Sequence, residues 1–302
     1  MNLDDLCKAL DSYFEIERFV ENDWAELISE AERGALLRFL RPEFANGPWN
    51  GLMLNNPAST ETIDRVYLAV FPSQDILDTI IAMEVERGAP GALLFTHHPL
   101  AYSERAASFS PIATVQLEEL HEHHISLYSC HAPLDCHPET STASALAEAL
   151  GLEDTKRFAK YYGGYAGIHG KLTGMDFQTF AELVAEVCEL PQLRYDQVRN
   201  NGRIVEHIAI VPGGGGDIEV LGEAAVLGAD TFMTGQWWLF GDSPFAVNER
   251  VRMTSYLTAF KPNLVGASHY STEFVVLRDQ MPDWFRQHNL DTILIRQEDP
   301  WQ

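Results

Sequence analysis

Three short motifs in this chain place imidazole beside imidazole or carboxylate. They are His97 with His98, His131 with Asp135, and His269 with Glu273. Imidazole suits Zn, Fe, Ni and Cu, whereas carboxylate suits harder cations. Three or more histidines with at least two carboxylates are enough for two divalent ions, which commonly lie about 3.5–4 Å apart and share a bridging carboxylate and an activated water. The motifs therefore predict a dinuclear metal site, in which Asp135 or Glu273 is the candidate bridge.

A structural role is the alternative for each histidine. The chain has 11 histidines, so some of them cluster by chance. His121, His123 and His124 fall together at the end of an expected helix, where cationic side chains complement the helix dipole, and we exclude them. His137 follows Asp135 closely and stays a candidate neighbour of the site. The metal prediction requires the three motifs to meet.

The elements that must position these motifs are alternating strands and helices. In the first half, apolar runs at 65–71, 91–96 and 125–130 alternate with amphipathic stretches at 74–88, 112–124 and 141–151. This is the βαβ rhythm of an α/β protein, and a second series of the same kind runs from 178 to 296. The two series predict two α/β halves. Because binding groups gather just past the carboxyl ends of strands in such sheets, we expect the motifs to lie at those ends.

Composition excludes several other classes of protein. With 302 residues, 46% of them hydrophobic, the chain can form a full core in one large or two ordinary domains. A formal net charge of −23 disfavours a nucleic-acid partner, because phosphate binding relies on a basic field. No run approaches a membrane span, and the first residues do not resemble a signal peptide. Four cysteines without secretory context indicate free thiols, so we expect a cytoplasmic protein with no membrane partner.

An ordered set of motifs resembles the Nif-three-like family, whose members are often named GTP cyclohydrolase 1 type 2 homologues. The motifs are THHPL, HAPLDCHPE, VPGGGGDIEVLGEAAVLGADTFMTG and GASHYSTE, within about residues 47 to 290. The resemblance implies two intertwined three-layer α/β/α halves, a homohexamer, and two divalent ions per chain (Zn, Fe, Mn or Ni). The ligands it implies are His97, His98, Asp135, His269 and Glu273. His131 matches a family histidine beside the site, and we predict that it handles a proton there.

The resemblance also suggests a division of the chain. We expect an N-terminal helical extension over 1–46, the main α/β layers around the metal site over 47–155 and 205–302, and an intervening segment over 156–204. Apolar residues at helical spacing run through about residues 2 to 40. The sequence assigns no role to this extension.

Gln236 departs from the family pattern, because many relatives carry Glu after Thr-Gly. A glutamine can hydrogen-bond but cannot take up a proton at neutral pH, so three functions stay open. One is a metal-dependent hydrolase of a nucleotide-like or small heterocyclic substrate. Another is a non-enzymatic metal-binding, regulatory or partner-docking assembly protein, and a dinuclear phosphoesterase is a third.

The glycine run after residue 212 allows close approach of the backbone and exposes the N–H groups of a helix start. Such a turn can receive a phosphate or carboxylate, and a tight turn of purely structural importance is the alternative. We name Gly214 and Gly215 as candidate contacts with a small-molecule substrate.

Overall fold

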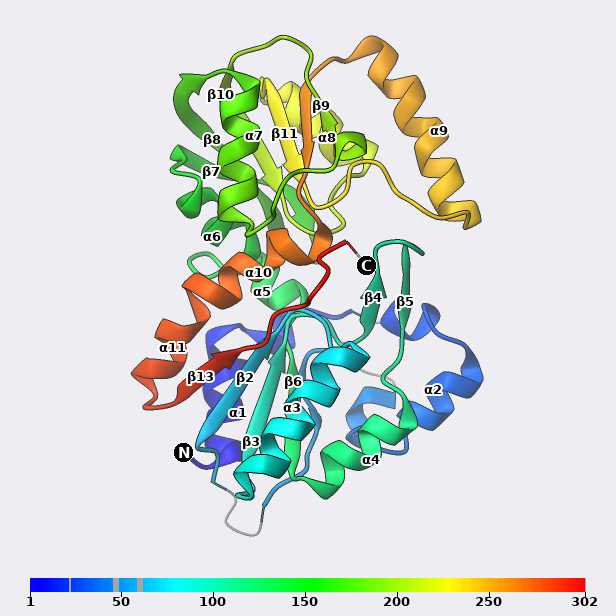
Figure 1. The fold of residues 1–302 in the computed structure, drawn as a ribbon, viewed down its shortest axis with the longest axis vertical. Helices are drawn as coiled ribbons and strands as arrows, with labels where there is room; N and C mark the ends of the chain where they lie inside the picture. Colours follow the sequence, from blue (N-terminus) through cyan, green and yellow to red (C-terminus); the bar gives the residue numbers. More distant parts are fainter. Residues whose placement is uncertain (22, 46–48, 59–61, 302) are drawn as a thin grey trace. The chain divides into compact units, whose positions relative to one another are not determined.

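The computed structural model describes residues 1–21, 23–45, 49–58 and 62–301, which fold into two compact units. The first unit comprises Met1–Tyr102, Phe109–His137 and Leu277–Glu298. The second comprises Ser103–Ser108, Pro138–Val276 and Asp299–Gln302. Each unit is thus assembled from separated segments, and each contains helices and a sheet (Figure 1). The mixed α/β class expected from the sequence is confirmed.

The first unit is built on a five-stranded sheet in the order β1-β6-β3-β2-β13, of which Figure 1 labels β2, β3, β6 and β13. The strands are β1 (Gly51–Leu54), β2 (Arg65–Ala69), β3 (Ala92–Thr96), β6 (Ile125–Ser129) and β13 (Asp291–Leu294). All neighbours are parallel except β1, which is antiparallel to β6. Thr96 at the end of β3 pairs with Ser129 at the end of β6. The segments that follow these two strands therefore leave the same edge of the sheet.

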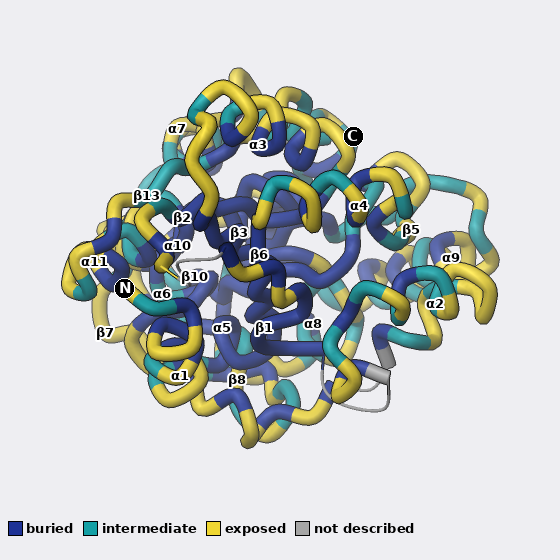
Figure 2. Tube along the Cα trace, turned by 90° about the horizontal axis from the view of Figure 1, so that it is seen from below, coloured by how far each residue is buried: buried dark blue, intermediate teal, exposed yellow. Residues whose placement is uncertain are grey.

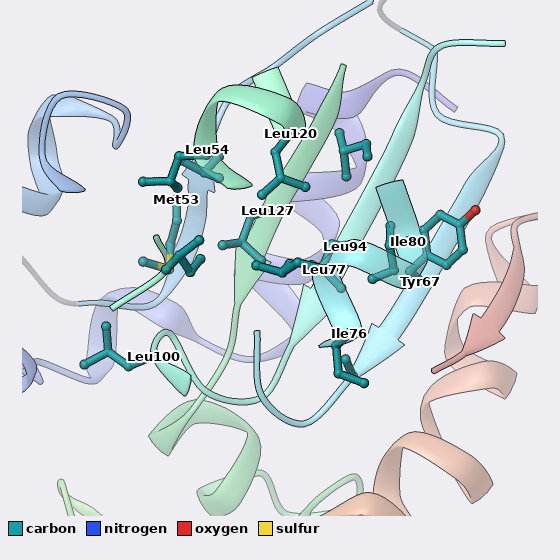
Figure 3. Packing of buried hydrophobic residues seen from close by; sticks show 14 of the residues in the cluster. Met53, Leu54, Tyr67, Ile76, Leu77, Ile80, Leu94, Leu100, Leu120 and Leu127 are labelled. Atoms are coloured by element: carbon teal, nitrogen blue, oxygen red, sulfur yellow. The ribbon is translucent and has the colours of Figure 1, made fainter. Parts of the chain in front are cut away.

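Both faces of this sheet are covered by side chains. Leu94 on β3 packs in a cluster with Leu77 of α3 (Gln74–Arg87) and Leu120 of α4 (Thr114–Glu122), as Figure 3 shows. Because side chains alternate along a strand, Phe95 lies on the other face. There its ring is 6.4 Å from Phe14, which follows α1 (Leu3–Tyr13), and 5.8 Å from Phe285 of α11 (Met281–Gln287). Burial on both faces explains why β3, the central strand, is apolar from Ala92 to Phe95, and Figure 2 shows the strand as buried.

The second unit is built on a six-stranded sheet in the order β7-β8-β10-β11-β12-β9. The strands are β7 (Glu153–Tyr161), β8 (Gly164–Met175), β9 (Val198–Arg199), β10 (Val205–Val211), β11 (Thr231–Thr234) and β12 (Asn263–Gly266). β10, β11 and β12 are parallel, with Val211, Thr234 and Gly266 in register at their carboxyl ends. The loops after these three strands thus share one edge.

Helices and short elements complete the chain. The second unit carries α6 (Thr142–Ala149), α7 (Phe177–Val187), α8 (Ile218–Val226), α9 (Pro244–Ala259) and the start of α10 (His269–Asp279). Leu221 of α8 and Met253 of α9 pack with Phe232 of β11 in its core. Shorter elements are α5 (Ala132–Cys136), the pair β4 (Ala101–Ser103) and β5 (Ser108–Ser110), and the 3-10 turns η3 (Pro42–Ala45) and η4 (Tyr195–Gln197). In the described ranges, no helix has the length and hydropathy needed to cross a membrane.

The N-terminal segment is only partly helical. It contains α1, η1 (Ile16–Arg18), η2 (Asp23–Glu26) and α2 (Glu30–Leu36). The continuous helical spacing seen in the sequence is interrupted after α1, where Glu15 has a left-handed backbone with a φ of 50°. Glu21 consequently lies outside any helix, between η1 and η2, and its side chain is fully buried.

Candidate metal centre

Three buried histidines meet at the carboxyl edge of the first unit's sheet. His97 and His98 follow β3 directly, and His131 follows β6 after one intervening residue. Their ring centroids are 4.5 Å (His97 to His98), 4.7 Å (His98 to His131) and 5.0 Å (His97 to His131) apart. One nitrogen of each ring lies within 4.8 Å of the others, so the group could hold a metal ion.

Asp135 adds a carboxylate to this cluster. It lies on the short helix α5, whose N-cap is His131, and one helical turn places both side chains on one face. Its Oδ1 is 3.6 Å from Nε2 of His97, and its Oδ2 is 3.9 Å from Nε2 of His131. The sequence pair His131 and Asp135 is thus joined to His97 within the first unit.

Further contacts orient the rings of His97 and His98. Nδ1 of His97 is 2.9 Å from the carbonyl oxygen of Cys130. Because a carbonyl only accepts, this nitrogen carries the proton, and Nε2 is the nitrogen that can bind a cation. Metal-ligating histidines usually donate their other N–H in this way. The ring of His98 stacks on Phe71 at 4.5 Å. Buried imidazoles oriented around a carboxylate are a donor set that fits a divalent transition metal.

Glu21 and Trp24 complete the surroundings of His131, and sequence reasoning missed both. Oε2 of Glu21 is 2.6 Å from Nδ1 of His131, and the Trp24 ring meets the His131 ring edge-on at 4.8 Å. Burial alone would raise the pKa of Glu21, but His131 and hydrogen bonds from Asn50 and Trp24 bring it down to about 2. Burial would lower the pKa of His131, yet the carboxylate of Glu21 raises it above its ordinary value. The Glu21 carboxylate is therefore ionised, and it accepts a short buried hydrogen bond from the N–H at Nδ1 of His131.

The second unit brings His269 and Glu273 together. Ser268, with a φ of 66°, turns the chain from β12 into α10, which begins at His269. One turn later, Oε1 of Glu273 is 3.1 Å from Nε2 of His269, and both residues are buried. Gly213 lies directly against them, since a Cβ at this position would be 1.9 Å from Oε1 of Glu273 and 2.9 Å from Nε2 of His269.

Glu104 supports the start of α10 from the loop between β4 and β5. Its Oε1 accepts hydrogen bonds from the Ser268 hydroxyl at 2.6 Å and from the backbone N–H of Tyr270 at 3.2 Å. Burial raises the pKa of Glu104 to about 8, although these hydrogen bonds oppose the shift. A lone glutamate in a loop gave no signal in the sequence.

The remaining candidates have different surroundings. Gln236 follows β11 and is buried, with 2% of its surface exposed. Gly214 is exposed and leaves room for a Cβ, which would be 3.7 Å from Cε1 of His269. A Cβ on Gly215 would be 2.1 Å from Cγ1 of Val211, so packing of the turn alone requires glycine there. His137 packs its ring on Tyr13 at 4.3 Å, which is a structural contact.

Comparison with known proteins identifies one family and relatives that share one name. The sequence model of the family described as Duf34/NIF3 (NGG1p interacting factor 3) matches residues 35–300. A protein of Deinococcus radiodurans named GTP cyclohydrolase 1 type 2 homolog is 29% identical over 261 residues, covering 82% of this chain and 87% of the relative. The Pyrococcus horikoshii protein of the same name is 28% identical, with 82% and 88% covered.

Solved structures show the same fold. A crystal structure of a Thermus thermophilus protein aligns with a TM-score of 0.66 at 21% identity and covers 99% of both chains. A Bacillus cereus protein described as related to NIF3 aligns with a TM-score of 0.61 at 14% identity, covering 99% of this chain and 97% of its own. At these identities the likeness supports the fold and no more.

Proposed function

Because the chain belongs to the Duf34/NIF3 family, we propose that it is a dinuclear divalent-metal-binding protein that acts as a metal-dependent hydrolase of a nucleotide-like or small heterocyclic substrate. The observation that carries the proposal is the cluster of buried imidazoles around Asp135 at the edge of a parallel sheet. Similarity to proteins named GTP cyclohydrolase 1 type 2 homologues supports the substrate class.

The proposed ligands are the five residues that the family resemblance implies. They are His97, His98 and Asp135 in the first unit and His269 and Glu273 in the second. A pair of divalent ions bound by them would supply Lewis acidity for hydrolysis. This mix of nitrogen and oxygen donors suits Zn, Fe, Mn or Ni. Gly214 and Gly215 are the proposed substrate contacts, and a homohexamer is the proposed assembly.

The residues around the ligands pack against the first unit's cluster, which is buried, and orient it. Phe71 and Trp24 lie against the His98 ring at 4.5 Å and 5.8 Å. His131 holds a proton on Nδ1, because that nitrogen faces the carboxylate of Glu21. Burial lowers the local dielectric constant, and this strengthens the electrostatic interactions within the donor set.

The proposal is tested first by metal content. We expect about two metal equivalents per chain, by elemental mass spectrometry, in untagged protein purified without chelator. The double variant His97→Ala, Glu273→Ala should lose them while its circular dichroism is unchanged.

A matched control is available elsewhere in the chain. Glu119 and His123 form a half-buried pair of the same residue types, with Nε2 of His123 3.5 Å from Oε2 of Glu119. The double variant Glu119→Ala, His123→Ala should keep its full metal content. Wild-type protein that stays metal-free after incubation with Zn, Mn and Fe would refute the metal-binding proposal.

Catalysis is tested separately with the metal-loaded protein. Turnover of a nucleotide that is lost with chelator and recovered with metal is the expected result. If no nucleotide or generic phosphate ester turns over while both ions are bound, the hydrolase proposal is wrong. The buried Gln236 favours the second candidate, a non-enzymatic metal-binding or partner-docking protein, because its amide cannot exchange a proton at neutral pH.

A further inference from the structure

Glu21 brings a fully buried carboxylate to the histidine cluster of the first unit. Its Oε1 accepts hydrogen bonds from Nδ2 of Asn50 at 2.6 Å and from the backbone N–H of Ala132 at 2.9 Å. Its Oε2 accepts from Nε1 of Trp24 at 2.9 Å and is paired with Nδ1 of His131 at 2.6 Å. Two partners on each oxygen offset the cost of burying the charge and fix the carboxylate in one position.

This arrangement determines which nitrogen of His131 faces the cluster. An ionised carboxylate only accepts hydrogen bonds, so Nδ1 of His131 carries a proton. Nε2 is then the nitrogen whose lone pair can bind a cation, and it lies on the side of Asp135. The backbone of His131 is anchored as well, because its N–H donates to Oδ1 of Asn50 at 2.7 Å. Both the ring and the backbone of His131 are therefore oriented.

We propose that Glu21 is a positioning residue that makes His131 a direct metal ligand through Nε2, so that His97, His98 and His131 hold one ion together. The inference rests on the metal-binding part of the proposed function and adds a sixth ligand to the five that the family resemblance implies. A histidine that donates its other N–H to a carboxylate is a common arrangement at metal sites, and loss of such a carboxylate costs about 10–100-fold in metal affinity.

The inference also gives the N-terminal segment a role. The family match begins at residue 35, so Glu21 and Trp24 lie outside it, whereas Asn50 and His131 lie within it. Glu21, between η1 and η2, supplies the carboxylate behind His131, and Trp24 of η2 supplies the indole against its ring. It thus completes the surroundings of a ligand that belongs to the family-matched part of the chain.

The test is a double-mutant cycle on Zn²⁺ affinity, measured by competition with a chromophoric chelator. Glu21→Gln keeps the shape of the side chain but removes its charge and half of its accepting capacity. We expect it to weaken the affected Zn²⁺ site about 10–100-fold. In a His131→Ala background the same substitution should change the affinity less than twofold, since Glu21 acts through His131. Glu26→Gln, an exposed change in the same segment, is the matched control and should have no effect.

A crystal structure of wild-type protein loaded with Zn²⁺ tests the ligand directly and does not depend on a variant that folds. Anomalous scattering should place an ion about 2.0–2.1 Å from Nε2 of His131. An ion on His97 and His98 with His131 outside ligand distance would overturn the inference and leave the proposed function standing. So would an equal loss of affinity from Glu21→Gln with and without His131. Wild-type protein that binds no Zn²⁺ would overturn both.

Discussion

Gly213 offers a sharp test of the ligands in the second unit. A Cβ at this position would be 1.9 Å from Oε1 of Glu273, whereas ordinary van der Waals contact begins near 3.4 Å. In Gly213→Ala the carboxylate must therefore move by at least about 1.5 Å, the difference between these two distances. The backbone adds strain, because Gly213 has a φ of 63°, and this left-handed conformation costs an L-residue about 1–2 kcal/mol.

The two effects have separate readouts. The backbone strain should lower the thermal unfolding midpoint by roughly 2–8 °C, taking about 2–4 °C per kcal/mol for a chain of this size class. Displacement of Glu273 should also weaken metal binding in protein that is fully folded. We expect the metal affinity to fall by at least about tenfold, which corresponds to about 1.4 kcal/mol of binding free energy. Affinity is measured at a temperature where the variant is fully folded.

Gly214→Ala is the neighbouring control. Gly214 is exposed, is not among the glycines with a left-handed backbone, and has its nearest atom at 3.7 Å from an added Cβ. It should keep both the wild-type midpoint and the wild-type affinity. If Gly213→Ala binds metal as tightly as wild type, then Glu273 is not a ligand in the position that the structure gives it, and the reasoning is refuted.

Two further predictions concern stability. Burial raises the pKa of Glu104 to about 8, so the folded protein holds this proton more tightly than the unfolded chain, whose carboxyl has an ordinary pKa near 4.5. Metal-free protein should therefore lose stability, on the order of a few kcal/mol, as pH rises from about 4.5 to about 8. The assay is the unfolding midpoint measured across this pH range. In Glu104→Gln the midpoint should depend less on pH. Phe95→Ala should lower the free energy of unfolding by about 3–5 kcal/mol in urea titrations, because the ring is fully buried against Phe14 and Phe285. Val226→Ala is the control. The Val226 side chain is 89% exposed, so its loss should change the free energy of unfolding by less than about 0.5 kcal/mol.

Most of the parallel strands could be predicted from the sequence, because their apolar runs are buried on both faces and therefore carry a strong signal. The strands at 65–69, 92–96 and 125–129 fall inside the predicted runs. The long antiparallel pair β7 and β8 was not predicted. Its residues are mostly exposed or half-buried, so the sequence there has neither a continuous apolar run nor a clean alternation. A hydrophobic pattern reflects burial, so it does not predict a strand that buries few side chains.

The histidine motifs could be predicted for a related reason. In each unit, neighbouring parallel strands end in register, so residues that directly follow different strands are brought to one edge. A position in the sequence just after an apolar run therefore carries information about position in space. Gly213 shares this property, yet four consecutive glycines gave no basis for choosing it over Gly214 and Gly215.

Glu21 has no such position in the sequence. It is one of 44 acidic residues, and it lies in an irregular stretch where no periodicity separates a buried carboxylate from a solvated one. Its burial is possible only because donors from residues 24, 50, 131 and 132 converge on it, and such long-range compensation leaves no local trace. A metal ligand can thus be anticipated from the strand it follows, whereas the carboxylate that orients it becomes visible only when the whole unit has folded. For this reason the Glu21 and His131 cycle tests what the structure adds to the sequence.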